Sequence, residues 1–102
     1  MGKHLITATI RDRKGNVLSR AVNNYLRTHP VQAKWAEATG NPTRIFLHAE
    51  ISALVKLRKD DRPYSISIER YTKDGLPALA KPCAVCEAAL KHWGISHVSY
   101  TI

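Results

Sequence analysis

The chain has 102 residues, 44% of them hydrophobic, which suffices for one buried core but hardly for two, so we expect a single domain over residues 1–102. Sixteen lysines and arginines against eight acidic residues give a net charge of +8, which favours polyanionic or phosphorylated ligands, although a solvated basic surface would explain it equally well. The two cysteines are only three residues apart and the first ten residues lack the apolar core of a signal peptide, which argues against a secreted protein. No apolar run approaches the ~20 residues that a membrane span needs. We therefore expect a soluble, cytoplasmic protein.

The first part of the chain has the pattern of a hairpin followed by a helix. Residues 4–10 and 16–23 are rich in isoleucine, valine, leucine and threonine, and Gly15 lies in the segment between them. This pattern predicts two strands joined by a turn. Residues 29–40 place a proline where a first helical turn tolerates it and a glycine where a helix stops, so they predict a helix.

The second part alternates helices and strands. Apolar residues at helical spacing predict helices over residues 48–59 and 83–93. Alternating isoleucine and serine predict a strand over residues 64–71, and residues 97–102 close the chain as another strand. The expected order is β-β-α-α-β-α-β, which indicates an α/β fold with a mixed four-stranded sheet and helices on its faces.

Three residues of metal-binding type stand at the starts of the second and third predicted helices. Cys83 and Cys86 are three residues apart, so both thiolates are able to reach one ion, and His48 begins the other helix. If the two helix starts meet, one imidazole and two thiolates hold Zn²⁺ and leave the fourth tetrahedral position for water, as in catalytic zinc sites. Glu50, in the same first turn as His48, would then exchange protons with that water without binding the metal.

An H-x-E triplet with a distant P-C-x-x-C run is the signature of zinc-dependent nucleobase deaminases. The chain resembles the cytidine deaminase-like superfamily, most closely the small deaminase-like proteins of phages and large viruses. The resemblance is carried by "LHAEISALVKL", "KPCAVC", "AVNNYLRTHPVQAKWA" and "GISHVSYT", which together with the third strand cover most of the chain. It implies a minimal three-layer deaminase-like fold and the hydrolytic removal of the exocyclic amine of cytosine or, in some branches, adenine.

The resemblance also implies roles for individual residues. It makes His48, Cys83 and Cys86 the zinc ligands and Glu50 the proton shuttle. It assigns a substrate contact to an asparagine at the end of the second strand, where Asn23 matches better than its neighbour Asn24. It gives the backbone N–H of Ala49 a hydrogen bond to the carbonyl of the base.

Several residues have more than one interpretation. His29 is either a loop or capping residue or a contact to the phosphate or base of the substrate. Trp35 and Trp93 fit a hydrophobic core, with stacking on a base as the alternative. Cys83 and Cys86 would also suit a closed Cys₂His₂ site with His92 and His97, or a redox pair, but neither alternative uses the His-Ala-Glu triplet.

Three functions follow from these patterns. The first is a deaminase acting on cytosine in single-stranded DNA or RNA or in a free (deoxy)cytidine nucleotide. The others are an adenosine deaminase acting on tRNA or another nucleic acid, and a zinc-containing binding module without turnover. The chain lacks elements that flank the fold in larger members, and its uncovered strand edges lead us to expect a homo-oligomer.

Overall fold

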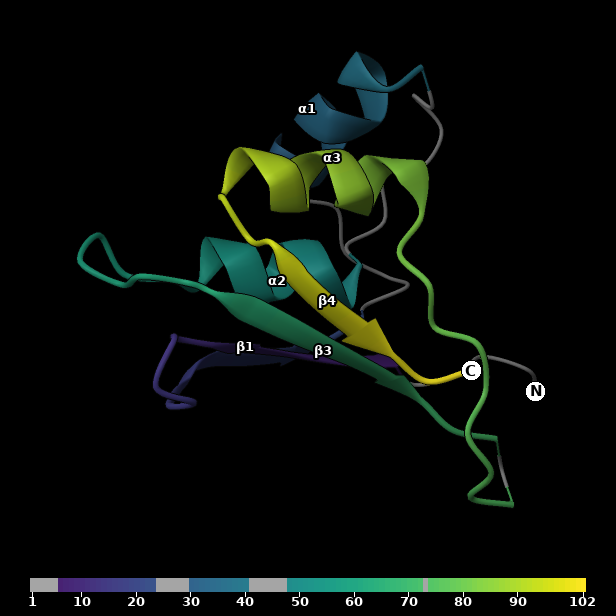
Figure 1. Ribbon diagram of the computed structural model, residues 1–102. Helices are drawn as coiled ribbons and strands as arrows, with labels where there is room; N and C mark the ends of the chain where they lie inside the picture. The colour runs from purple at the N-terminus through teal and green to yellow at the C-terminus, as the bar shows by residue number, and fades with distance from the viewer. Residues whose placement is uncertain (1–5, 24–29, 41–47, 73) are drawn as a thin grey trace.

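The computed structural model describes residues 6–23, 30–40, 48–72 and 74–102 (Figure 1). These residues form four strands and three helices in the order that the sequence predicts. None of the helices in this part of the chain combines the length and the apolar character that a membrane span requires. The elements are β1 (Ile6–Arg11), β2 (Val17–Val22), α1 (Pro30–Ala38), α2 (Ala49–Val55), β3 (Ser65–Arg70), α3 (Ala84–His92) and β4 (His97–Tyr100).

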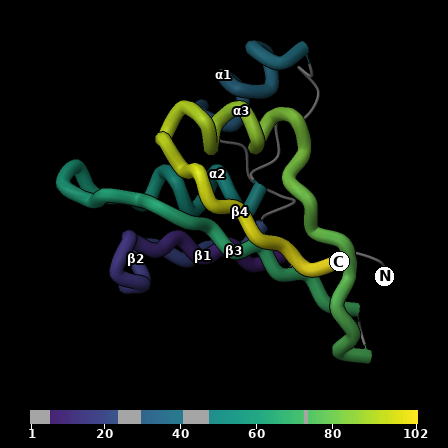
Figure 2. The backbone as a smooth tube through the Cα atoms, viewed as in Figure 1, coloured from purple at the N-terminus to yellow at the C-terminus, as the bar shows by residue number. Residues whose placement is uncertain are grey.

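The strands form one mixed sheet in the order β2-β1-β3-β4 (Figure 2). Strand β1 is antiparallel to both of its neighbours, whereas β3 and β4 are parallel and are connected through α3. The predicted α/β class, mixed four-stranded sheet and element order are therefore confirmed. Two parallel neighbouring strands need a long crossover connection, and α3 provides it between β3 and β4.

The turn between β1 and β2 is organised by one aspartate. The Asp12 carboxylate accepts hydrogen bonds from the backbone N–H groups of Lys14 and Asn16, both at 2.9 Å, and these bonds lower the pKa of Asp12. Gly15 has a φ of 90°, in the left-handed region where a side chain would be strained. The predicted hairpin is thus confirmed, and its turn uses the aspartate as well as the glycine.

All three helices lie on the same side of the sheet (Figure 1), so the described residues do not place helices on both faces, as the expected three-layer fold would. The alternating side chains of Ala8 and Ile10 on β1 and of Ile66 and Ile68 on β3 are buried and belong to the core that the helices cover. Helix α2 contacts β1 and β2, α3 contacts α2, and α1 contacts both α2 and α3. The intervening strand residues are largely polar, which explains why the core lies on one side of the sheet in the described part of the chain.

Helix α2 is shorter than its apolar spacing predicts, because it ends at Val55 rather than at residue 59. The backbone N–H of Arg58 donates to the carboxylate of Asp61 at 2.7 Å, and the N–H of Asp61 donates back to the carbonyl of Arg58. A side chain that offers the backbone an alternative hydrogen bond competes with helix continuation. Residues 58–61 therefore form a turn that projects from the body of the molecule.

The core predicts a clear contrast between two residues of the hairpin. Ile10 is fully buried under the helices, so Ile10→Ala should lower the free energy of unfolding by about 2–5 kcal/mol. Val17 is 56% exposed, so Val17→Ala should change it by no more than about 0.5 kcal/mol. Chemical denaturation of both variants measures the difference, and equal losses would contradict this assignment of the core face.

Candidate metal centre and substrate cavity

The metal-binding residues occupy the N-cap positions of two helices. His48 precedes α2 with φ and ψ of −80° and 155°, and Cys83 precedes α3 with −73° and 171°. Their carbonyls accept the first helical hydrogen bonds from Ser52 and Glu87, but neither side chain caps its own helix. An extended N-cap residue directs its side chain across the helix start, and here the two side chains are directed toward each other.

Three ligand atoms from these helix starts form a compact group. The Nδ1 of His48 lies 3.2 Å from the Sγ of Cys86 and 3.6 Å from the Sγ of Cys83. All three ligand atoms lie within 4.8 Å of one another. A tetrahedral ion with Zn–S of about 2.3 Å and Zn–N of about 2.0–2.1 Å holds nitrogen and sulfur about 3.6 Å apart. The group therefore has the chemistry and the spacing of a metal centre, and it is formed by the three residues that the sequence predicts.

The two thiols differ in their acidity. A hydrogen bond from Cys86, assisted by the imidazole of His48, lowers the pKa of Cys83 to about 3. The same hydrogen bond, together with burial, raises the pKa of Cys86. The protein alone thus favours one thiolate and one thiol, and a bound cation would favour the second thiolate.

Glu50 lies in the first turn of α2 beside the three ligands, with only 5% of its surface exposed. Burial raises the pKa of its carboxyl, and the carboxyl is close enough to Cys86 for a hydrogen bond. It does not belong to the group of ligand atoms found among the described residues. A buried carboxyl with a raised pKa, next to a metal site but outside it, has the properties of a general acid and base.

A buried glutamine on α1 fixes the position of His48. The backbone N–H of His48 donates to the Oε1 of Gln32 at 3.2 Å, and Gln32 has no exposed surface. This residue is not among the sequence-predicted site residues. The sequence does offer one indication of its role. Gln32 lies four residues before Ala36 and so on the same buried face of α1, where a polar side chain needs a hydrogen-bond partner.

A cavity of about 220 Å³ opens directly beside the metal centre. This volume lies below the ~300–1,000 Å³ of typical drug-sized pockets and is large enough for a nucleobase. The cavity is lined by five of the predicted site residues and by additional ones from β1, β3 and the segment before α3. Its walls are formed by Ile6, Asn23, His48, Ala49, Glu50, Arg70, Leu79, Ala80, Lys81 and Cys83.

Two cations in this wall are not predicted by the sequence analysis. Arg70 ends β3, and its Nη1 donates to the carbonyl of Leu79 at 3.3 Å. Its Nε is buried and has no hydrogen-bond partner among the residues that the structure describes. Lys81 is exposed at the rim. A buried guanidinium N–H without a partner is an available donor for an acceptor on a ligand.

The remaining predicted residues divide into those that the structure brings to the site and those that it does not describe. Asn23 lines the cavity, and its Oδ1 accepts the N–H of Ile6 at 3.0 Å. Ala49 also lines it, and as the first residue of α2 its N–H has no partner within the helix. Asn24 and His29 lie outside the described residues.

The two other histidines considered as ligands take part in different contacts. His92 packs against Trp35 with ring centroids 5.2 Å apart, and His97 stacks on Tyr64 at 4.3 Å. The metal-binding group among the described residues includes neither of them. The alternative of a closed Cys₂His₂ site is therefore not supported by the structure.

Comparisons of the chain with protein-family models and with curated proteins found no match. The interpretation of the site consequently depends on its own residues and geometry.

If His48, Cys83 and Cys86 form a metal centre, metal binding should depend on each of them. The purified protein should bind one divalent ion per chain, as measured by elemental analysis, and a chelator should lower its melting temperature because the ion binds only the folded state. His48→Ala and Cys86→Ser should lose most of the bound metal. His97→Ala is the matched control, because this exposed histidine lies outside the group. Equal metal content in His48→Ala and the control would contradict the assignment.

Proposed function

We propose that the protein is a zinc-dependent hydrolytic deaminase that removes the exocyclic amine of cytosine, in single-stranded nucleic acid or in a free (deoxy)cytidine nucleotide. The observation that carries this proposal is the buried carboxyl of Glu50 beside three metal-binding residues at the wall of a small cavity. The acid lies beside the ligands without belonging to their group, which is the position that a proton-transferring residue requires.

The ligand set favours zinc. Two thiolates and one imidazole are soft and borderline ligands, which suit Zn²⁺ and exclude the hard cations Mg²⁺ and Ca²⁺. Three protein ligands are the number found in catalytic zinc sites, which keep a position for water or substrate. When bound, zinc would supply a water molecule whose pKa is lowered to about 7.

Glu50 is proposed to move the protons of the reaction. Its carboxylate would accept a proton from the attacking water and hold it in the water-poor environment of the helix start. A C–O bond would then form at C4 of cytosine, the C4=N3 electron pair would move to N3, and N3 would take the proton held by Glu50. The remaining hydroxyl proton would pass through Glu50 to the amine nitrogen as the C–N bond breaks and the C4 carbonyl forms. Water and the cytosine base thus give uracil and ammonia without any oxidant or reductant.

Three groups in the cavity wall are proposed to orient the base and its sugar. The N–H of Ala49 lies at the start of α2, where it would donate to the base carbonyl. Asn23 would contact the base or sugar, and the guanidinium of Arg70 would bind a phosphate or carbonyl oxygen. The expected homo-oligomer and cytoplasmic location stay predictions.

The first test removes proton transfer while keeping the shape of the site. Glu50→Gln should retain the metal but lose roughly 10²-fold or more in turnover, which is the usual contribution of general acid–base catalysis. Glu87→Gln is the matched control, since Glu87 lies in the first turn of α3 and is exposed. Product formation from cytidine, dCMP, adenosine and a cytosine-containing oligonucleotide, followed by mass spectrometry, measures the effect. Loss of metal from Glu50→Gln would make Glu50 a ligand and contradict its proposed role.

A second test concerns substrate orientation. Asn23→Ala should raise KM by roughly three- to tenfold, the value of one lost hydrogen bond, with metal content unchanged. Because Asn23 also holds the N–H of Ile6, the melting temperature is measured in parallel. Asn24→Ala is the natural comparison, and a larger increase in KM there would transfer the assignment to Asn24.

A further inference from the structure

A second depression lies at the opposite end of α2 and α3 from the metal centre. Its volume is about 640 Å³, and its walls are the segment from Leu57 to Pro63 after α2 together with His92 and Trp93 at the end of α3. Both helices begin at the metal centre and end here. The nine residues of α3 correspond to about 13 Å, so this depression is separate from the small substrate cavity.

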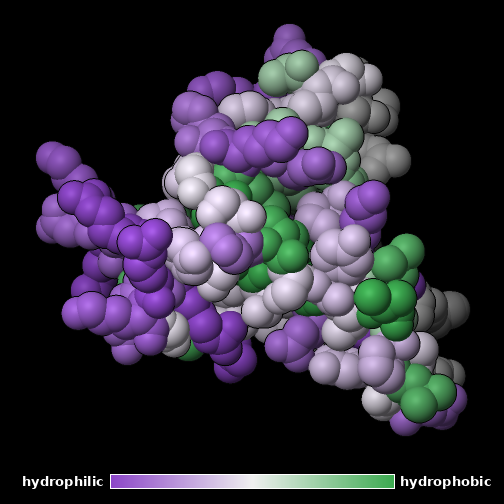
Figure 3. Space-filling model, viewed as in Figure 1, coloured by the Kyte–Doolittle hydropathy of each residue, from purple (hydrophilic) through white to green (hydrophobic). Residues whose placement is uncertain are grey.

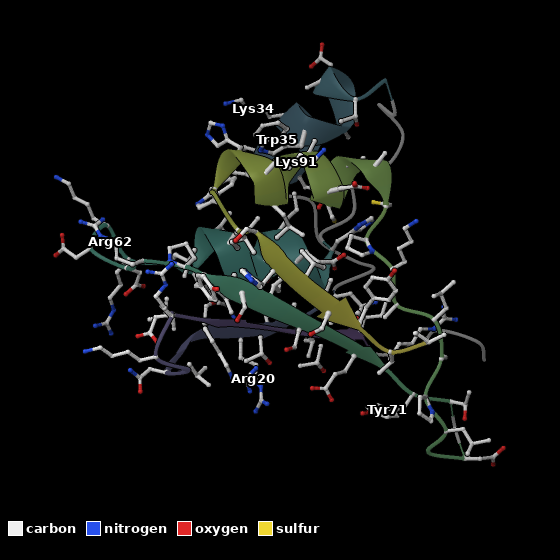
Figure 4. The ribbon with its side chains drawn as sticks, viewed as in Figure 1. Arg20, Lys34, Trp35, Arg62, Tyr71 and Lys91 are labelled. Atoms are coloured by element: carbon white, nitrogen blue, oxygen red, sulfur yellow. The ribbon has the colours of Figure 1, made fainter. Side chains whose placement is uncertain are left out.

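Cations lie in the wall of this depression and on the neighbouring helices α1 and α3. Arg58, Lys59 and Arg62 are exposed on the projecting turn, and Lys34 and Lys91 are exposed on α1 and α3. In Figure 3 hydrophilic side chains gather at the end of the molecule where this turn projects, and Figure 4 shows Arg62 extending from it. The same turn carries two acids, Asp60 and Asp61, and the carboxylate of Asp61 accepts the backbone N–H of Arg58. We call these five cations the distal basic surface.

Aromatic rings lie within this surface. Trp35 and His92 have ring centroids 5.2 Å apart, and His92 and Trp93 have centroids 5.4 Å apart. The ammonium group of Lys34 lies 5.8 Å from the ring centroid of Trp35. Both tryptophans are only partly buried, so each packs on the core and also presents ring surface to solvent. Cations next to accessible aromatic rings are the combination that binds single-stranded nucleic acids.

The turn of the hairpin extends the same surface. The N–H of Tyr64 donates to the carbonyl of Arg11 at 2.9 Å, which holds the end of the projecting segment against the hairpin. The guanidinium of Arg13 lies 5.3 Å from the ring centroid of Tyr64, and the Tyr64 ring stacks on His97. Residues 11–13 of the hairpin therefore lie beside Tyr64, at the end of the projecting segment, although the two are far apart in sequence.

A purely structural role does not account for this arrangement. Lys91 and His92 in the last turn of α3 complement the negative end of a helix dipole. Arg58, Lys59 and Arg62 lie beyond the end of α2 in a turn, where that effect has largely decayed, and helix stabilisation does not require Trp93 beside them.

We infer that the distal basic surface, with Trp35 and Trp93, binds single-stranded DNA or RNA. The cations would contact phosphates, and the rings would stack on unpaired bases, which a duplex does not offer. The further step, that a bound strand continues to the small cavity and places a cytosine there, rests on the proposed function. A free nucleotide in that cavity would be too short to reach a surface at the other end of α3.

The test measures binding rather than turnover. A fluorescent single-stranded oligonucleotide is titrated with the metal-loaded protein at several salt concentrations, and Lys59→Ala/Arg62→Ala is compared with Arg20→Ala/Lys56→Ala. The control pair removes the same charge from two exposed residues that lie near one another. In Figure 4 Arg20 lies below the sheet, on the other side from Lys34 and Lys91. Because the chain has only two tryptophans, Trp35 and Trp93, intrinsic fluorescence reports directly on stacking.

We expect binding by the unmodified protein to weaken steeply with salt and to quench tryptophan fluorescence. The Lys59→Ala/Arg62→Ala variant should bind roughly tenfold or more weakly at 0.1 M salt, and the slope of log affinity against log salt should fall by about 1.4 for two lost phosphate contacts. The control should change affinity less than twofold. Equal weakening of both pairs, absence of binding at low salt, or binding to anionic phospholipid vesicles but not to oligonucleotides would overturn the inference.

The two proposals fail in different ways. Strand binding without deamination of any substrate would refute the proposed function alone, and deamination of monomers without strand binding would refute this inference alone.

Discussion

The site depends on one constraint, which is that the starts of α2 and α3 are held against each other. His48 and Cys83 are N-cap residues, so each stands where its helix begins, and a separation of these ends by a few ångströms would leave no common ligand position. The core enforces this contact, because α2 packs on β1 and β2 and α3 packs on α2. Gln32 adds a hydrogen bond from α1 to the backbone of His48. The fold therefore provides the rigidity that a pre-organised metal centre requires.

The two ends of α2 and α3 carry different chemistry. The N-terminal ends bring together thiols, imidazole and a buried acid, whereas the C-terminal ends are followed or flanked by arginines, a lysine and Trp93. Positive charge is kept at a distance from the metal centre, apart from Arg70 and Lys81 in the cavity wall. This separation would let a long polyanion bind without competing for the metal ligands. Five of the sixteen basic residues of the chain belong to the distal basic surface.

Local patterns in the sequence predict the strands, the helices and the three metal-binding residues, because each depends on spacing within one short segment. The same patterns do not reveal Gln32 or Arg70, since both reach the site only through packing between elements distant in sequence. The early end of α2 also escapes the apolar pattern, because it results from a side-chain hydrogen bond by Asp61. The roles expected for Asn24 and His29 fall on residues that the structure does not describe.

The central claim is that the metal centre and Glu50 together replace the amine of cytosine with an oxygen atom from water. The most direct measurement is the mass spectrum of the product formed by the zinc-loaded protein from a cytosine substrate in water enriched in oxygen-18. The account predicts uracil that carries one solvent oxygen in place of the exocyclic amine, together with an equal amount of ammonia. Unchanged cytosine in every substrate form, from nucleoside to oligonucleotide, with zinc fully bound, would contradict it.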